Sequence, residues 1–313
     1  MKEIDRAARG RSRILVQMSD LFDSFISRIT PTEHELEIAR QHRETVASRI
    51  RLEGVLELIN SGSYIKGTSI RPFTDLDLFV GFDATEYEAE EEKVITRLHY
   101  HLGQSFPASQ VRLQTHSVGV IFGDGFRVDV VPGFALRTRV GYYRVRNRDD
   151  GRWVTTSISR HKEFFTKRQN RDARFRDMVR LAKHWKNQRR RNYSSFLVEL
   201  LVARAFKDGI PQGRDTALHA FFEWMSTGGL RKPVVFNDYY NATGIELPSD
   251  SLVVLDPSDA RNNVASAIDR PALDELVAAA DWSRARSQTA LSMTSRRESA
   301  NCWRDMLPGF PFA

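Results

Sequence analysis

Three aspartates lie in two short segments whose alternation of polar and apolar residues is typical of β-strands. The first segment is residues 74–80 (TDLDLFV), which holds Asp75 and Asp77, and the second is residues 126–132 (FRVDVVP), which holds Asp129. Residues i and i+2 of a strand point to the same face, so Asp75 and Asp77 project together while the leucines between and after them point into the core. Carboxylates that converge in this way require cations or protons to neutralise them. Such hard oxygen ligands favour two Mg²⁺ ions, or Mn²⁺, in a site that transfers phosphoryl or nucleotidyl groups.

A glycine–serine pair, Gly62-Ser63, stands before the first aspartate strand. Glycine lets the backbone approach a phosphate closely, and the N–H groups and the Ser63 hydroxyl can then bind the phosphate oxygens. Gly67 and Thr68 are expected to close this turn back toward the strand, while Lys66 suits a solvated lysine and a phosphate contact equally well. A generic turn or an exposed strand end would explain either motif alone. Their combination predicts metal-dependent nucleotidyl transfer.

The composition is that of an ordinary globular chain with a basic balance. The 313 residues are 41% hydrophobic and 28% charged, enough for one large domain or two lobes. The formal net charge of +7 favours nucleotides or nucleic acid as partners, although solvated arginine faces would explain it as well. Cys302 is the only cysteine, which excludes an internal disulfide and cysteine-rich zinc sites. With no apolar run near the ~20 residues of a membrane span and no signal peptide, we expect a cytoplasmic protein with no membrane contact.

The first 57 residues are expected to form helices. Apolar residues recur at helical spacing over residues 3–28. A second helix is predicted to start at residues 30–33 (TPTE), with Thr30 as the cap and Glu33 completing a capping box, and to end near Glu53. These helices would pack across both parts of the remaining chain.

Residues 58–160 are predicted to form the catalytic core, built from short strands with one intervening helix. The expected strands are 75–81, 127–131, 142–145 and 153–156, with a looser candidate at 112–122 and a polar turn at 147–151. The helix is expected over 86–102, with the glutamates at 88 and 90–92 on its solvated face.

Residues 161–313 are predicted to form a helical lobe. A helix over 171–191 would place Phe175, Met178, Ala182 and Trp185 on one stripe, and residues 195–206 are apolar enough to be the buried centre. The arginines at 189–191 suit a helix C-terminus slightly better than a nucleic-acid contact. We therefore expect a cleft between two lobes near residue 160.

The run from Gly62 through Asp75 and Asp77 to Asp129 resembles the polymerase-β-type nucleotidyltransferase core. Residues 176–186 (RDMVRLAKHWK) and 193–199 (YSSFLVE) resemble the second lobe of bacterial CD-NTases of the SMODS type and of 2′-5′ oligoadenylate synthetases. A further segment similar to this group is residues 254–264 (VLDPSDARNNV). The resemblance covers roughly residues 60 to 310. It implies an α+β fold in which a mixed sheet carries the nucleotidyltransferase core, with a helical C-terminal lobe and an N-terminal helical spine.

The resemblance also implies roles for two residues outside the core. Lys183 would contact the donor triphosphate and Ser195 would hydrogen-bond the same phosphates. The residues themselves leave alternatives, because Lys183 could be an exposed helix lysine and Ser194 or Ser195 could cap the helix that follows. Asp256 suits turn and cap chemistry better than catalysis.

In this family the expected reaction joins nucleoside triphosphates, ATP among them, into a cyclic di- or trinucleotide second messenger with release of pyrophosphate. Asp75, Asp77 and Asp129 would hold the two Mg²⁺ ions. The resemblance further implies anti-phage defence signalling, an effector protein that senses the product, and a possible regulatory protein or nucleic-acid activator.

Other functions remain open at this point. A CCA-adding or poly(A)-type enzyme would use the same chemistry to extend an RNA end, and an oligoadenylate synthetase would make a linear product. A catalytically silent module that binds nucleotides or RNA is the alternative of another class, although binding alone does not require three clustered carboxylates.

Overall fold

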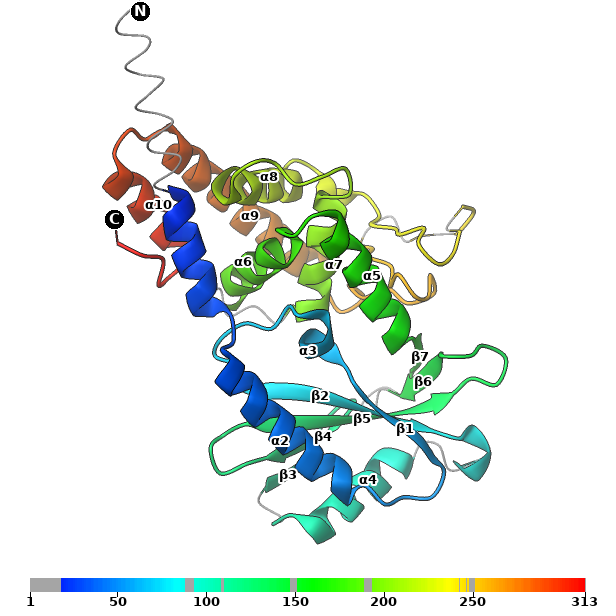
Figure 1. Cartoon of the computed structure of the whole chain (residues 1–313). Helices are drawn as coiled ribbons and strands as arrows, with labels where there is room; N and C mark the ends of the chain where they lie inside the picture. The colour runs from blue at the N-terminus through cyan, green and yellow to red at the C-terminus, as the bar shows by residue number, and fades with distance from the viewer. Residues whose placement is uncertain are drawn as a thin grey trace, which may run out of the picture.

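The structure is a computed structural model that describes residues 18–87, 93–107, 110–146, 151–188, 193–241, 243–245, 247 and 251–312. A twisted sheet forms one lobe and a group of helices forms the other, with the small helix α3 (Gly62–Lys66) between them (Figure 1). Each lobe has its own cluster of buried hydrophobic side chains. The α+β architecture with a mixed sheet and a helical lobe is therefore confirmed.

The sheet has seven strands, and its centre is the one parallel pair among them, β2 with β5. Antiparallel pairing extends the sheet from this pair in the order β1-β2-β5-β4-β3, while β6 pairs with β5 and with β7. The strands are β1 (Val55–Asn60), β2 (Asp75–Phe82), β3 (Val111–Leu113), β4 (Val118–Ile121), β5 (Arg127–Ala135), β6 (Tyr143–Arg146) and β7 (Trp153–Thr156). All predicted strands are present, and the looser candidate at 112–122 is the β3–β4 hairpin.

Helices α2 (Glu33–Arg49) and α4 (Val94–Ser105) cover one face of the sheet (Figure 1). Leu76, Leu78 and Val80 of β2 are at most 2% exposed in this core, as the alternation predicted. Because side chains alternate along a strand, Asp75 and Asp77 lie on the opposite face. That face is the one turned toward the helical lobe.

The helical lobe is built around α7, which is the buried centre that its apolar sequence predicted. Its helices are α5 (Ile158–Arg171), α6 (Phe175–Gln188), α7 (Ser195–Ala205), α8 (Arg214–Ser226), α9 (Arg270–Ser292) and α10 (Arg296–Met306), with the short turn η4 (Gly229–Arg231). Phe175, Met178, Ala182 and Trp185 form the predicted buried stripe of α6. The helix predicted from 171 begins only at Phe175, because Arg171 is the last residue of α5 and Asp172 is its C-cap.

The start of α2 differs from the prediction. Thr32 is the N-cap, and its side chain exchanges hydrogen bonds with Glu35 in a capping box. Thr30 instead belongs to the end of the preceding helix, where its hydroxyl donates to Ile26 O at 2.7 Å. The prediction of Thr30 as cap and Glu33 as its partner was therefore wrong by two residues, and α2 ends at Arg49 rather than near Glu53.

The helix predicted over 86–102 is also corrected. The 3-10 turn η1 (Ala84–Tyr87) and α4 flank residues 88–92, so the helix begins only at Val94. The predictions for the glutamates at 88 and 90–92, for the turn at 147–150 and for the arginines at 189–191 lie outside the described residues. So does the predicted helical stretch before residue 18, while residues 18–29 are helical.

The two N-terminal helices divide between the lobes. Phe22 and Phe25 of the helix over 18–29 pack into the helical lobe, where Phe22 meets Trp303 edge to face. Ala39 and Val46 of α2 belong to the core of the sheet. In Figure 1 the two helices run in succession along one side of both lobes. Among the described residues no helix is long and apolar enough to span a membrane.

A buried ionic cluster joins the lobes. The Glu199 carboxylate of α7 is fully buried and binds the ammonium groups of Lys66 from α3 and Lys183 from α6. Thr68 Oγ1 donates to Glu199 Oε1 at 2.6 Å, and Lys183 Nζ donates to Thr68 O at 3.0 Å. The pKa of Glu199 is far below its ordinary value, because the two lysines outweigh the effect of burial. We call Glu199, Lys66, Lys183 and Thr68 the Glu199 cluster.

Substitution of Glu199 by Gln should destabilise the protein strongly. Gln keeps the shape of the side chain but leaves two buried ammonium groups without a counter-charge, which costs about 3–5 kcal/mol. The loss would be measured as the free energy of unfolding in urea titrations.

Glu163→Gln is the matched control, because Glu163 also pairs with two basic residues, Arg160 and Lys167, but on the exposed surface of α5. Its cost should stay below about 1 kcal/mol. Equal losses for the two variants would contradict a stabilising role for the buried cluster.

Candidate functional site

The three aspartates are brought together by the register of two parallel strands. In the β2–β5 pair, Asp77 lies opposite Asp129, and Asp75 lies opposite Arg127. Paired residues of neighbouring strands are about 4.8 Å apart and share a face of the sheet. Asp129 is 7% exposed, Asp77 is half-buried and Asp75 is exposed, so the group opens from the sheet toward solvent.

The Gly62-Ser63 pair is packed against Asp77. It forms the first turn of α3, and Ser61 N donates to Asp77 O at 2.9 Å, which ties the turn to β2. Gly62 has φ +64°, and a Cβ at this position would lie 1.7 Å from Asp77 Oδ2. Position 62 therefore requires glycine for two reasons: the left-handed backbone conformation and the close approach of the Asp77 carboxylate.

The turn closes as the sequence predicted. Gly67 is left-handed at φ 64°, and Thr68 N donates to Ser63 O at 3.0 Å. The Ser63 hydroxyl lies 3.0 Å from the Ser69 hydroxyl. Lys66 is not the solvated lysine that was one of its two interpretations, since it is 9% exposed and bound to Glu199.

The electrostatics of the carboxylates favour a cation. Burial and the nearby Asp129 and Asp75 carboxylates raise the pKa of Asp77 from 3.8 to about 6. Burial likewise raises the pKa of Asp129, against the lowering effect of Arg127 and Gln114. Gln114 Nε2 donates to Asp129 Oδ1 at 2.9 Å and so fixes that carboxylate. A bound divalent ion would neutralise the mutual repulsion of these carboxylates and so stabilise their ionised forms. Carboxylate oxygens are also the ligands that Mg²⁺ prefers.

Arg127 accompanies the carboxylates. Its Nε lies 2.9 Å from the Asp129 carboxylate, and its Nη2 donates to Asp75 Oδ2 at 3.3 Å. Within the part of the chain that the structure describes, no three acidic, histidine or cysteine side chains are gathered tightly enough to form a ready metal cage. Two of the three carboxylates are engaged by a guanidinium instead.

Lys183 and Ser195 lie on the helical lobe at different depths. Lys183 is 2% exposed, and its ammonium donates to Thr68 and to Glu199, at 2.5 Å in the latter case. It is therefore not an exposed helix lysine. Ser194 is the N-cap of α7, with its hydroxyl accepting from Leu197 N at 3.0 Å. Ser195 is the exposed first residue of the helix and takes no part in the cap.

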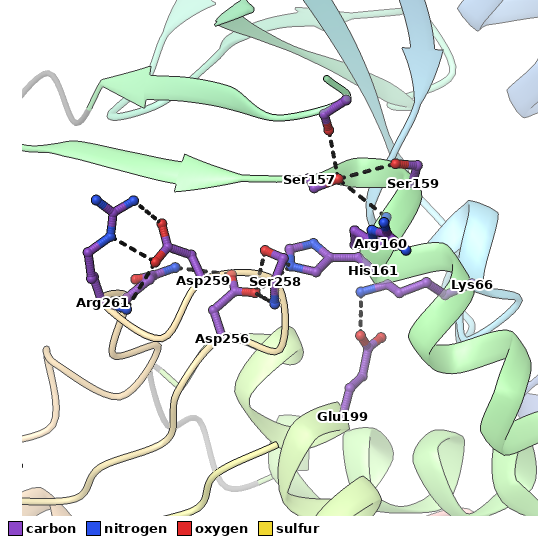
Figure 2. A network of polar contacts seen from close by, with 12 residues as sticks. Lys66, Ser157, Ser159, Arg160, His161, Glu199, Asp256, Ser258, Asp259 and Arg261 are labelled. Carbon is purple, nitrogen blue, oxygen red and sulfur yellow. Dashed lines mark hydrogen bonds and ion pairs between the residues drawn. The ribbon is translucent and has the colours of Figure 1, made fainter. Parts of the chain in front are cut away.

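Asp256 performs turn chemistry, as the residue types suggested. Its Oδ1 accepts hydrogen bonds from Ser258 N and Ser258 Oγ, both at 2.7 Å, and its Oδ2 accepts from Asn262. The His161 ring of α5 joins this group at 2.7 Å from Asp256 Oδ1, which lowers the pKa of Asp256 (Figure 2). Figure 2 also shows Lys66 and Glu199 beside this network. This link joins α5 to the 256–262 turn within the helical lobe.

A pocket of about 590 Å³ lies between the sheet and the helical lobe. Trp153 and Thr155 of β7 line one side, and Asp259 and Asn262 line the other. His116, in the same β3–β4 turn as Gln114, also borders it. None of the three aspartates lines this pocket, and its nearest link to them along the chain is His116, which follows Gln114 by two residues.

Three of these residues received no role from the sequence. Arg127 could have been found, because it precedes Asp129 by two positions and must share its face of the strand. Gln114 and Glu199 act across long separations in the chain, of 15 and 133 residues to their partners. No local sequence pattern predicts contacts between residues so far apart in the chain.

The raised pKa of Asp77 should appear as a pH dependence of stability in metal-free buffer. A carboxyl whose pKa is higher in the folded state destabilises the fold progressively as pH rises from about 4 to about 6. The Asp77→Asn variant lacks this ionisation. Its free energy of unfolding should therefore increase relative to the wild type by about 2 kcal/mol over this interval and stay constant above it.

Urea titrations with EDTA at several pH values would measure the difference. The variant Asp208→Asn, at an exposed carboxylate beside Lys207, controls for the loss of one acid. A difference between Asp77→Asn and wild type that does not change with pH would contradict the raised pKa.

Comparison with known proteins identifies the family of the chain. Residues 16–170 match the family model of the Second Messenger Oligonucleotide or Dinucleotide Synthetase domain, SMODS. A cyclic AMP-AMP-AMP synthase of Escherichia coli (strain MS 115-1) is 34% identical over 236 residues, which is 71% of this chain and 73% of the relative. The CBASS oligonucleotide cyclase CdnC of Escherichia coli (strain KTE188) is 28% identical over 86% of this chain and 90% of its own.

Solved structures extend the likeness to the whole fold. The CdnC of E. coli MS115-1, solved in complex with HORMA-deltaN, superimposes with a TM-score of 0.81 at 25% identity, covering 93% of this chain and 97% of that one. The same CdnC solved with ATP gives a TM-score of 0.80. The chain thus belongs to the SMODS-domain CD-NTases of the polymerase-β nucleotidyltransferase superfamily, the nucleotidyltransferases that synthesise cyclic oligonucleotides.

Proposed function

We propose that this cyclic oligonucleotide synthase uses ATP and makes a cyclic tri-adenylate for anti-phage signalling, with Asp75, Asp77 and Asp129 holding its divalent ions. The observation that carries the metal site is the register of Asp77 with Asp129, against which Gly62 is packed. The choice of adenine and of three units is taken from the cyclic AMP-AMP-AMP synthase relative.

The carboxylates would act together on the divalent ions. When bound, two such ions supply charge neutralisation for the donor triphosphate and activation of the attacking hydroxyl. Asp129 is buried, and Gln114 fixes its carboxylate with a hydrogen bond. Asp77 is half-buried, and the hydrogen bond from Ser61 N to its main-chain carbonyl fixes its backbone. Asp75 is the exposed member and would complete the site from the solvent side.

The donor triphosphate would lie between α3 and the start of α7. Gly62 and Ser63 offer backbone N–H groups of the first turn of α3, which have no partner within that helix, and Ser195 offers an exposed hydroxyl. Lys183 would attract the phosphates through its charge. The Glu199 cluster places two ammonium groups against one carboxylate and so leaves one net positive charge beside α3. A direct contact of Lys183 with phosphate would require it to give up a hydrogen bond to Thr68 or Glu199.

The acceptor nucleotide would occupy the pocket between the sheet and the helical lobe. Its volume of about 590 Å³ falls in the range of ~300–1,000 Å³ that is usual for small-ligand sites. Trp153 provides an aromatic surface, and Asn262 and His116 provide polar groups.

Regulation by a second protein is part of the proposal. The CdnC relative was solved in complex with HORMA-deltaN, so a HORMA-type protein is the candidate partner of this chain. The other relative is named a CBASS oligonucleotide cyclase. We expect an effector protein that senses the cyclic product to act after this chain in the same signalling pathway.

Product analysis tests this function. Incubation with ATP and Mg²⁺, with and without a HORMA-domain partner, should give a phosphatase-resistant product with the mass of cyclic tri-adenylate. Mass spectrometry and linkage-specific nucleases would identify it. The double variant Asp75→Ala/Asp77→Ala should reduce the product to background.

Parallel reactions separate the alternatives. Elongation of an added RNA end would instead identify an RNA-end nucleotidyltransferase, and a linear, phosphatase-sensitive product would identify an oligoadenylate synthetase. A wild type that forms no product under any of these conditions would contradict the proposal in favour of a silent binding module.

Gly62→Ala should damage catalysis more than stability. The added Cβ would force the Asp77 carboxylate out of its place, and displacement of a reacting geometry by about 1 Å can cost about 100-fold in rate. Initial rates of product formation would measure the loss. Gly125→Ala is the matched control, because Gly125 has φ +85° but no atom near its Cβ position. Similar activities of the two variants would contradict the packing argument.

A further inference from the structure

The position of Arg127 among the carboxylates is set by the backbone. Parallel pairing places it directly opposite Asp75, and it precedes Asp129 by two residues on β5. Its side chain must therefore stand on the same face as all three aspartates. A guanidinium at this point can therefore reach the carboxylate oxygens directly.

The contacts of Arg127 use the oxygens that a metal ion would need. Its Nε lies 2.9 Å from the Asp129 carboxylate and its Nη2 lies 3.3 Å from Asp75 Oδ2. An ion coordinated by those carboxylates would have to displace both hydrogen bonds. It would also be repelled by the guanidinium, which cannot lose its charge by deprotonation.

Arg127 is placed to leave the carboxylates for another anion. Its side chain is 39% exposed, between those of Asp75 at 58% and Asp129 at 10%, so solvent and ligands can reach the guanidinium. Guanidinium groups bind phosphate oxygens through two parallel hydrogen bonds at least as well as they bind carboxylates. A triphosphate that arrives with its divalent ion offers such oxygens and lowers the cost of releasing Arg127.

We propose that Arg127 is an internal counter-ion that makes binding of divalent ions depend on the nucleotide. In the metal-free protein its guanidinium holds Asp75 and Asp129; when the nucleotide and ions enter, the guanidinium is transferred to the phosphates. This inference rests on the proposed metal site at Asp75, Asp77 and Asp129. Its consequence is that free ions alone bind weakly, and that ions and nucleotide strengthen each other's binding by the same factor.

Mn²⁺ binding without nucleotide is the direct test. The whole chain, freed of metal with EDTA and dialysed, would be titrated with Mn²⁺ while the free ion is followed by electron paramagnetic resonance. Arg127→Met removes the competing charge and should bind Mn²⁺ about tenfold or more tightly than the wild type. Arg127→Lys keeps the charge and should remain as weak as the wild type.

The same titration with a non-hydrolysable ATP analogue measures the dependence on nucleotide. Mn²⁺ affinity should rise strongly in the wild type and by a clearly smaller factor in Arg127→Met. Arg270→Met is the matched control, because Arg270 pairs with Asp274 on α9, far along the chain from the site, and its removal should change neither affinity.

Thermal melting supplies a readout that does not depend on turnover. In EDTA, Arg127→Met should melt below the wild type, because Asp75 and Asp129 lose their cation, and Mn²⁺ should restore most of the difference. If Arg127→Met does not fold in EDTA, the titrations would be made with Arg127→Gln, which retains a hydrogen-bond donor.

Two results would overturn the proposal, and only the second would also contradict the proposed metal site. Equal or weaker Mn²⁺ binding by the uncharged variants would show that Arg127 supports the carboxylates rather than competing with the ion, and the proposed metal site would stand. Absence of Mn²⁺ binding by every variant, with and without the analogue, would remove the metal site as well.

Discussion

The parallel pairing of β2 with β5 is the constraint on which the site depends. It sets Asp77 beside Asp129 and Asp75 beside Arg127 without any help from flexible segments. The strands are held by a core on the other face of the sheet, where Leu78 and Val130 are fully buried. Because a shift of one residue would turn the carboxylates toward that core, the hydrophobic pattern fixes the register and the register fixes the chemistry.

The helical lobe is attached to this sheet by charge as well as by packing. Glu199 reaches α3 from α7, and Lys183 reaches the same turn from α6. The segment that Glu199 and Lys183 bind also contains Gly62, which lies against Asp77. The helix α3 therefore contacts both the helical lobe and the carboxylate group. A partner that binds the helical lobe would have a short physical route to the proposed metal site.

The sequence predicted the class of reaction and most of the fold, because both depend on local patterns of residues. Alternation predicted β2 and β5, and the spacing of Asp75 and Asp77 predicted their common face. The errors arose where competing local signals lie a few residues apart, as at the start of α2, where Thr30 and Thr32 are both plausible caps. Gln114 and Glu199 could not be predicted, since their roles depend on contacts between segments distant in the chain.

Opposite charges are distributed across the site in a way that suits a charged substrate and its ions. Lys66 and Arg127 both lower the pKa of Asp77, so the Glu199 cluster and the carboxylate group influence each other although each is separately paired. The carboxylate side has an excess of negative charge, and the α3 side has an excess of positive charge. Divalent ions would settle on the first and phosphates on the second. The two sides would thus suit a metal–triphosphate complex better than either of its parts alone. In our proposal, the guanidinium between the carboxylates is the group that changes partners when that complex binds.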